Sequence, residues 1–417
     1  MLSICYNNSL MRYLSVTKAV LTINNNSHRG KMKSTHSNKV SNTSKSLAIH
    51  MQHHGKLATQ VTTPIKTKED LALVYTPGVA EVSRAIAQDK SRVYDYTIKG
   101  HTVAVVTDGS AVLGLGNVGA EASLPVMEGK AAIFKTFADI DAFPIALNTQ
   151  DSAEIISIVK AIAPTFGGIN LEDIAAPRCF EIEEALQDIG VPVMHDDQHG
   201  TAIVVLAGLI NAFKLKSIKL SQAKVVLLGA GAAGNGITQL LVDQVADITL
   251  VDSKGIVDSS RPDLDPHKAS LAKITNHDNK SGDLQTALRG ADVFIGVSKG
   301  GLLKPADIEL MNKQPVIFAL ANPEPEIMPD EAKRAGAFIV ATGRSDFANQ
   351  VNNSLVFPGI FKGALQSRTP RITRVMKLAA AQALAGLITS PSSDKIIPEP
   401  FDNGVAEAVA RAVVESR

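Results

Sequence analysis

Tryptophan is absent from this sequence of 417 residues, and aromatic residues make up only 4% of it. The two cysteines, Cys5 and Cys179, are too few for a disulfide framework, which excludes a disulfide-stabilised scaffold. Few cysteines favour a reducing compartment and predict a cytoplasmic protein. Long apolar runs are also missing, because the longest, Ala202–Phe213, is too short to span a bilayer. No membrane segment is therefore expected.

Acidic residues are missing from the first 68 positions, which carry ten lysines and arginines. Residues 1–45 are rich in Ser, Asn, Thr and Lys, which predicts a disordered basic extension. The same composition is typical of an organelle transit peptide, so a mitochondrial or related location is the alternative to the cytoplasm. A dispensable tail, or a true start at Met32 or Met51, is the simpler interpretation. The net charge of +1 gives no reason to expect nucleic acid or an anionic membrane as a partner.

From about Ser46 onward, short apolar runs alternate with helical patterns. Strands are expected at residues 102–107, 144–148, 166–170, 191–195, 225–228, 248–251, 292–297, 316–320 and 338–341. Strands that alternate with helices imply parallel sheets, and the length suits two domains. The pattern predicts an α/β fold with an N-terminal α/β domain (residues 46–205) and a Rossmann-type dinucleotide-binding domain with C-terminal helices (residues 206–417).

Residues 223–252 carry the pattern of a dinucleotide-binding unit: strand, G-x-G-x-x-G turn, helix, and a second strand that ends at Asp252. Gly229 permits a tight turn, Gly231 lets the backbone approach a pyrophosphate, and Gly234 lets the helix pack closely. Asp252 is placed to accept from the ribose hydroxyls. Because an acid there repels a 2′-phosphate, NAD is predicted over NADP, although Lys254 close by softens this preference. The alternative is a domain that kept the turn and lost the ligand.

Four carboxylates follow buried strands in the first half of the chain: Glu172, Asp173, Asp196 and Asp197. Mg²⁺ and Mn²⁺ prefer oxygen ligands, and a hydrated ion leaves room for substrate oxygens. Paired acids at the start of a loop are also commonly just solvated, so spacing leaves both interpretations open. His195 and His199 flank these acids, and we favour hydrogen-bonding partners over a zinc site.

Four further side chains stand where chemistry is possible. Tyr75 precedes a rigid Thr-Pro-Gly turn, and Lys130 begins an apolar helix, where burial can lower the pKa of a lysine and make it a base. Asn322 and Asn353 follow late strands, at the edge where open α/β sheets bind ligands. Ordinary surface, core and turn roles explain each of them equally well. Cys179 is expected to be structural.

Eight segments, taken in order, resemble the malic enzymes, and most closely the short, bacterial-type forms. They are VYTPGVA (74–80), VVTDGSAVLGLGNVG (105–119), LPVMEGKAAIFK (124–135), GGINLEDI (167–174), MHDDQHGTAIV (194–204), LLGAGAAG (227–234), ALANPEPEI (319–327) and NQVNNSLVFPGIFKGAL (349–365). The resemblance implies oxidative decarboxylation of L-malate to pyruvate and CO₂, with NAD or NADP and Mg²⁺ or Mn²⁺. It also implies oxaloacetate decarboxylation as a partial reaction and at least a homodimer.

The resemblance also implies individual roles. The metal ligands would be Glu172, Asp173 and Asp197, with Asp196 beside them; Lys130 would be the general base and Tyr75 the general acid; Asn322 and Asn353 would contact substrate and nicotinamide. Larger malic enzymes carry, after the TDG motif, an arginine that holds a substrate carboxylate, and this chain has Ser110-Ala111 there. The group that binds the remote carboxylate is therefore unassigned.

Two other functions are compatible with the same motifs. One is a non-decarboxylating dehydrogenase of a hydroxy acid or an amino acid, which would need no metal and release no CO₂. The other is a non-catalytic dinucleotide sensor, which would bind the coenzyme without turnover. The presence of Lys130, Tyr75 and three acids together argues against the sensor.

Overall fold

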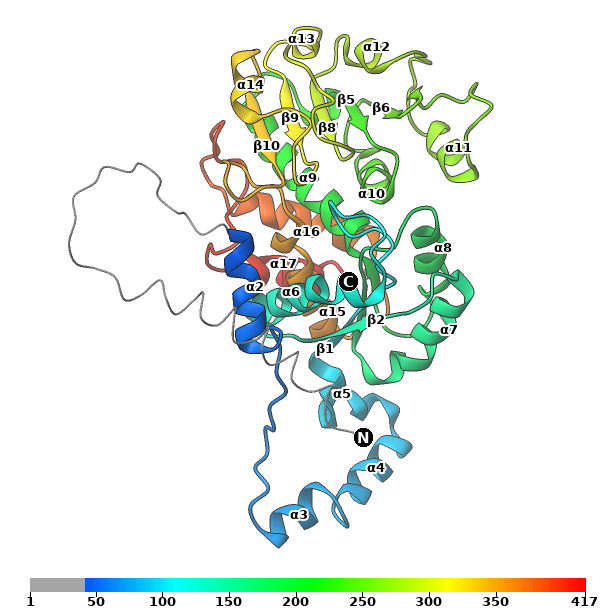
Figure 1. The fold of residues 1–417 in the computed structure, drawn as a ribbon, viewed down its shortest axis with the longest axis vertical. Coiled ribbons are helices and arrows are strands. Elements are labelled where there is room, and N and C mark those ends of the chain that lie inside the picture. Colours follow the sequence, from blue (N-terminus) through cyan, green and yellow to red (C-terminus); the bar gives the residue numbers. More distant parts are fainter. Residues whose placement is uncertain (1–41) are drawn as a thin grey trace, which may run out of the picture. The chain divides into compact units, whose positions relative to one another are not determined.

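The computed structural model describes residues 42–417, with side chains from residue 45 onward. The predicted extension therefore lies, up to residue 41, outside the described residues. The chain divides into two compact units, one ending at His54 and one comprising Gly55–Arg417. In the first unit the structure describes one helix, α2 (Asn42–His53). All further elements belong to the second unit (Figure 1).

A four-stranded parallel sheet forms the first half of the second unit, in the order β2-β1-β3-β4. Its strands are β1 (Thr102–Thr107), β2 (Asp141–Ala146), β3 (Gly168–Leu171) and β4 (Val193–His195), and its helices are α6 (Ala120–Ala138), α7 (Ser152–Ile162) and α8 (Arg178–Ala185). One face packs against α7 and α8 through Ile155, Val159 and Ile182, and the other against α6 through Met127 and Phe134. Helices cover both faces, so the strands are mostly apolar and the polar residues Asn170 and His195 stand out near the strand ends.

A six-stranded sheet forms the second half, in the order β10-β9-β8-β5-β6-β7. Its strands are β5 (Lys224–Leu228), β6 (Asp247–Asp252), β7 (Gly255–Ile256), β8 (Val293–Gly296), β9 (Val316–Ala319) and β10 (Ile339–Thr342). All are parallel except β7, a short antiparallel edge strand that the sequence did not predict. On one face lies α10 (Ala232–Leu241) with α9, and on the other α12 (Leu284–Leu288), α13 (Pro305–Ile308) and α14 (Pro329–Arg334).

The long helix α9 (Asp196–Lys214) connects the two sheets: it begins where β4 ends and packs against α10. The predicted division after residue 205 falls inside this helix, which packs against both halves. The limits of the two domains therefore remain a prediction. The C-terminal helices are α15 (Phe357–Ser367), α16 (Arg374–Gly386) and α17 (Val405–Glu415). Of these, α15 packs against α6 and α17, and α16 packs against α9. The end of the chain thus returns to the first half.

The expected strands and parallel sheets are confirmed. The sequence also predicts helices at residues 79–88, 127–138, 152–162, 181–188, 201–213, 373–386 and 405–414, and a helix covers most of each range. Helix α15 was missed because it holds Pro358, Gly359 and Gly363, and proline and glycine are poor helix formers. Also unpredicted was α3 (Lys68–Val74), which buries no residue. The remaining elements are α4 (Val79–Gln88), α5 (Val93–Tyr96), α11 (Pro266–Ala272) and the short 3₁₀ turns η2 (Lys90–Arg92), η3 (Ile98–His101), η4 (Ala163–Thr165), η5 (Leu220–Gln222) and η6 (Asn353–Leu355). Within residues 42–417, every helix is too short or too polar to cross a membrane.

Candidate active site

The ends of β3 and β4 bring the predicted metal ligands together. These strands are parallel neighbours with Leu171 opposite His195, so the residues that follow them meet at one edge of the sheet. One carboxylate oxygen from each of Glu172, Asp173 and Asp197 lies within 4.8 Å of the other two. The backbone N–H of Asp173 donates to Oδ2 of Asp197 at 3.0 Å. We call these three residues the acid cluster.

Within residues 42–417, one lysine, Lys130, contacts the acid cluster, and it does so at Glu172, which leaves too little positive charge for three carboxylates. Burial raises the pKa of Asp173 to about 9, and the charges of Asp197 and Glu172 add to the effect. Burial likewise raises the pKa of Glu172. Oδ2 of Asp173 is buried without a hydrogen-bond partner, which is costly for a carboxylate. A divalent cation that prefers oxygen ligands fits this donor set and would supply the missing charge.

Lys130 reaches the acid cluster from α6. Its Nζ lies 2.7 Å from Oε1 of Glu172 and 2.6 Å from Oδ2 of Asp196, and 4.2 Å from the centre of the Phe357 ring. Burial lowers the pKa of this amine, but the carboxylates of Asp196 and Glu172 outweigh burial and raise the pKa above its ordinary value. The residue expected to be the base is thus in direct contact with an expected metal ligand.

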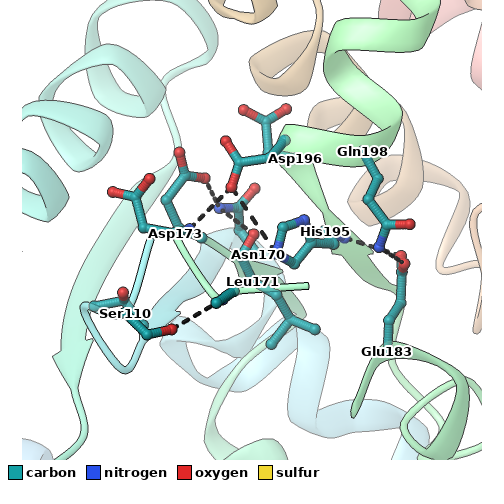
Figure 2. A network of polar contacts seen from close by, with 12 residues as sticks. Ser110, Asn170, Leu171, Asp173, Glu183, His195, Asp196 and Gln198 are labelled. Carbon is teal, nitrogen blue, oxygen red and sulfur yellow. Dashed lines mark hydrogen bonds and ion pairs between the residues drawn. The ribbon is translucent and has the colours of Figure 1, made fainter. Parts of the chain in front are cut away.

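A further buried carboxylate, that of Glu183 in α8, lies outside the acid cluster, on the other side of the end of β4 (Figure 2). It accepts from the backbone N–H of His195 at 2.9 Å, from Nε2 of Gln198 at 2.8 Å and from Nε2 of His199 at 3.0 Å. Burial opposes its charge, but His199 and the charge of Lys377 lower the pKa of Glu183 to about 2. His199 is therefore a hydrogen-bonding partner. His195 stays close to the acid cluster, with Nε2 3.9 Å from Oδ2 of Asp197.

Gln198 connects this region with the helix of the glycine turn. Its Oε1 accepts from Nδ2 of Asn235 at 2.8 Å. A Cβ on Gly236 would collide with the carbonyl of Gln198, so α9 and α10 cross at close range. The helix that begins with the acids and the helix expected to hold the pyrophosphate are thereby fixed to each other.

The glycine turn has the geometry that its sequence predicts. Gly229 has a φ of +121°, which disfavours a side chain, and a Cβ on Gly234 would collide with the carbonyl of Gly229. A Cβ on Gly231 would meet nothing within 4 Å, so the backbone is open to a ligand there. Beside the turn, a cavity of about 910 Å³ opens at the carboxyl ends of β5 and β6. This is the edge where open α/β sheets bind dinucleotides.

Asp252 lines that cavity but is not a free acceptor. Arg261 donates to both of its oxygens, at 2.8 and 3.2 Å, and Nζ of Lys268 donates at 2.9 Å. Nζ of Lys254 turns away from Asp252 to Asp263, at 2.8 Å. The acid that the sequence assigns to the ribose is thus paired with two cations.

The two asparagines lie where the halves of the second unit meet, and Tyr75 does not. Asn353 begins η6 and packs on the first turns of α9. It lies so close to Gly200 that a Cβ added to this glycine would be 3.0 Å from the Cβ of Asn353. Asn322 lies beside the loop after β1. A Cβ added to Gly114 of that loop would be 3.6 Å from the carbonyl oxygen of Asn322. The side chain of Tyr75, after α3, is 66% exposed.

Arg178 is a cation at this site that sequence reasoning missed. Its Nη2 donates to Oδ2 of Asp108 at 2.8 Å and to Oγ of Ser110 at 3.0 Å. A guanidinium therefore stands beside the residues that follow the TDG motif, where the sequence offered none. Glu183, Gln198 and Asn235 were missed too. Glu183 stands among other acids of α8, and Gln198 follows two acids at the start of α9, so the local sequence gave no signal that sets them apart.

Two parallel sheets, one ending in buried acids with a lysine and the other in a glycine turn, define a two-domain α/β protein with a dinucleotide-binding domain. Family comparison places it more narrowly. The malic enzyme N-terminal domain matches residues 54–187, and the malic enzyme NAD-binding domain matches residues 198–416. The chain belongs to the malic enzyme family.

Relatives support the same assignment over most of the chain. The bifunctional malic/malolactic enzyme of Bacillus subtilis is 55% identical over 375 residues, covering 89% of this chain and 92% of the relative. The NADP-dependent malic enzyme of Halomonas elongata is 47% identical, covering 87% and 91%. The crystal structure of the NAD-dependent malic enzyme of Thermotoga maritima superposes with a TM-score of 0.86 at 53% identity, covering 89% of this chain and 99% of that one.

Proposed function

We propose that this protein catalyses the oxidative decarboxylation of L-malate to pyruvate and CO₂, with reduction of NAD⁺ or NADP⁺ and a requirement for Mg²⁺ or Mn²⁺. The observation that carries the proposal is the contact of buried Lys130 with Glu172, at the edge of a cluster whose other two acids, Asp173 and Asp197, pair with no lysine or arginine of residues 42–417. A base next to a metal-binding cluster suits a substrate whose hydroxyl is held at the ion. Family membership supplies the substrate.

Glu172, Asp173 and Asp197 would hold the ion, which when bound would act as a Lewis acid, and a bound nicotinamide would be the acceptor of the hydride. Lys130 takes the proton of the C2 hydroxyl as C2 is oxidised. Positive charge bound at Glu172 would favour the neutral amine that this step needs. After CO₂ leaves C3, Tyr75 gives a proton to that carbon and pyruvate forms. Oxaloacetate, the ketone between these steps, would be decarboxylated when supplied directly.

Tyr75 can act as the acid only if its side chain reaches an acid cluster with its Lys130, but within its own chain this side chain is exposed to solvent. Helices α3 and α4 bury none of their residues, and Leu73 next to Tyr75 is 74% exposed. These helices lie apart from the β1–β4 sheet in Figure 1. Apolar helix faces without a partner are typical of an interface. We therefore propose a homodimer in which α3 and α4 pack against a second copy and carry Tyr75 to its Lys130.

The dimer proposal is tested by co-expressing Tyr75→Phe with Lys130→Ala, each inactive alone. A site built from two copies regains both groups once per mixed dimer, so about a quarter of the wild-type activity should return in a symmetric dimer. If Tyr75 acted on Lys130 of its own chain, no mixed dimer would hold an intact site. Activity that stays at the level of the single variants would then contradict the shared site.

The reaction itself is tested by measuring coenzyme reduction at 340 nm with L-malate and Mn²⁺, separately with NAD⁺ and NADP⁺, followed by quantification of pyruvate and CO₂. Equal amounts of reduced coenzyme and pyruvate are expected, and chelation of the metal should stop both. Reduced coenzyme without pyruvate would indicate a non-decarboxylating dehydrogenase. Coenzyme binding without turnover would indicate a sensor. Location in the cytoplasm is part of the proposal and can be checked by cell fractionation.

A further inference from the structure

Asp252 ends β6 at the position where dinucleotide-binding domains use an acid to accept the ribose hydroxyls. An ionised carboxylate offers about four acceptor positions. Here four donors occupy them: Oδ1 accepts from Nη1 of Arg261 at 2.8 Å and from the backbone N–H of Lys254 at 2.9 Å, and Oδ2 accepts from Nη2 of Arg261 at 3.2 Å and from Nζ of Lys268 at 2.9 Å. Only 6% of the side chain is exposed. A ribose diol would have to displace one of these donors.

Arg261 is held as firmly as the acid that it binds. Its Nε and Nη2 donate to Asp263 at 3.0 and 2.9 Å, and its Nη1 also donates to the carbonyl of Ile256 in β7 at 3.1 Å. Burial opposes the charge of Asp252, but the hydrogen bonds from Arg261 and Lys268 outweigh burial and keep the pKa of Asp252 below its ordinary value. We call Arg261 and Lys268 the clamp, since together they bind both oxygens of the acid.

The clamp neutralises the charge beside the ribose position. Three acids, Asp252, Asp263 and Asp265, pair with three cations, Lys254, Arg261 and Lys268, so this group carries a net charge of about zero at neutral pH. Lys254, Arg261 and Lys299 line the cavity at the end of β6. The other acids on its wall already accept local hydrogen bonds: Asp258 accepts from Ser260, and Asp283 caps α12. The cavity therefore offers donors rather than a free acceptor at Asp252, and the paired acid no longer repels a 2′-phosphate.

We propose that the clamp cancels Asp252 as an NAD-selecting acid, so that this protein accepts the 2′-phosphorylated coenzyme, NADP, at least as well as NAD. The inference concerns the coenzyme of the proposed function and rests on it for turnover, but not for binding. Family membership leaves the choice open, because the relatives described above include an NADP-dependent and an NAD-dependent enzyme. Of the cations that line the cavity, Lys254 is already paired with Asp263, which leaves Lys299 as the lysine closest to hand for the added phosphate.

The test measures dissociation constants of NADH and NADPH by coenzyme fluorescence on the full chain, without malate or metal. The wild type should bind NADPH at least as tightly as NADH. Arg261→Gln frees Asp252 and removes a positive charge, so the preference should shift toward NADH by about tenfold, as expected for one close charge interaction. Lys268→Met should shift it the same way by about threefold, because Lys268 is more exposed and Arg261 remains.

The matched control is Lys273→Met, which removes an equal charge from an exposed position at the end of α11 without touching Asp252. Its preference should equal that of the wild type. A wild type that binds NADH more tightly than NADPH would overturn the proposal. So would a preference that stays fixed, or moves toward NADPH, in both clamp variants. If Arg261→Gln fails to fold, as judged by circular dichroism, Lys268→Met decides. A shifted preference without malate turnover would leave the inference standing and refute the proposed function.

Discussion

Asp173 and Asp252 both follow a parallel strand at the carboxyl edge of a sheet, yet their surroundings are opposite. Asp173 is buried with two other carboxylates, has an oxygen without a partner, and has its pKa raised to about 9. Asp252 is surrounded by four donors, and its pKa is lowered. An acid that lacks positive charge is prepared for a cation, whereas an acid that is already neutralised no longer selects what binds beside it.

The largest expected effect is the loss of the cation from the acid cluster. Asp173→Asn should reduce Mn²⁺-dependent turnover by about 10²-fold or more, since ligand-shell changes commonly cost this much. Mn²⁺ should raise the melting temperature of the wild type and leave that of the variant unchanged, because only a binding ion stabilises the fold. An unchanged metal-induced shift would remove Asp173 from the ligand set.

Lys130 provides the next test, because it is the cation that contacts the acid cluster directly. Lys130→Ala should lower turnover by about 10²-fold or more, the usual scale of acid–base catalysis. Mn²⁺ should still raise its melting temperature, since the three ligands remain. The control is Lys135→Ala on the same helix, whose side chain is 53% exposed and pairs with Asp139. Wild-type turnover in the Lys130 variant would exclude it as the base.

Glu183 is a third acid to compare, because its carboxylate accepts several hydrogen bonds, as that of Asp252 does, but lies next to the acid cluster. In Glu183→Gln an amide N–H would face the donors of Gln198 or His199, so a buried polar contact is lost. The free energy of unfolding should fall by about 2 kcal/mol, measured by denaturant titration. The control, Glu184→Gln, changes an exposed residue of the same helix and should stay within about 0.5 kcal/mol of the wild type.

Repulsion within the acid cluster predicts a smaller, stabilising effect. Without metal, the raised pKa means that Asp173 must take up a proton on folding at neutral pH, which costs stability. Asp173→Asn avoids this cost, so the metal-free protein should gain on the order of 1 kcal/mol in unfolding free energy. The measurement is a melting curve in the presence of a chelator. The corresponding change in the other half, Asp252→Asn, leaves two cations without their acid and should destabilise. If both substitutions changed the unfolding free energy by the same amount, the opposite surroundings of the two acids would be contradicted.

The smallest effect is expected at Lys254. Its side chain is 65% exposed, and its Nζ pairs with Asp263 rather than with Asp252. Lys254→Met should therefore shift the preference between NADH and NADPH by less than about threefold, because exposed ion pairs contribute little. A larger shift than that of Lys268→Met would place the phosphate contact on Lys254 itself.

The order of strands and helices, the glycine turn and the positions of the acids could be predicted from the sequence, because alternation, turn chemistry and strand ends are local patterns. Strand ends pointed to four acids, Glu172, Asp173, Asp196 and Asp197, and left metal binding open; the choice of three ligands came from the family resemblance. Which acids find a cation became visible only in the folded chain. Lys130 comes to Asp196 from 66 positions away, and Lys268 comes to Asp252 from helix α11. Such pairings depend on how helices pack, and the strength of a charge interaction depends on distance and burial, which no local pattern contains.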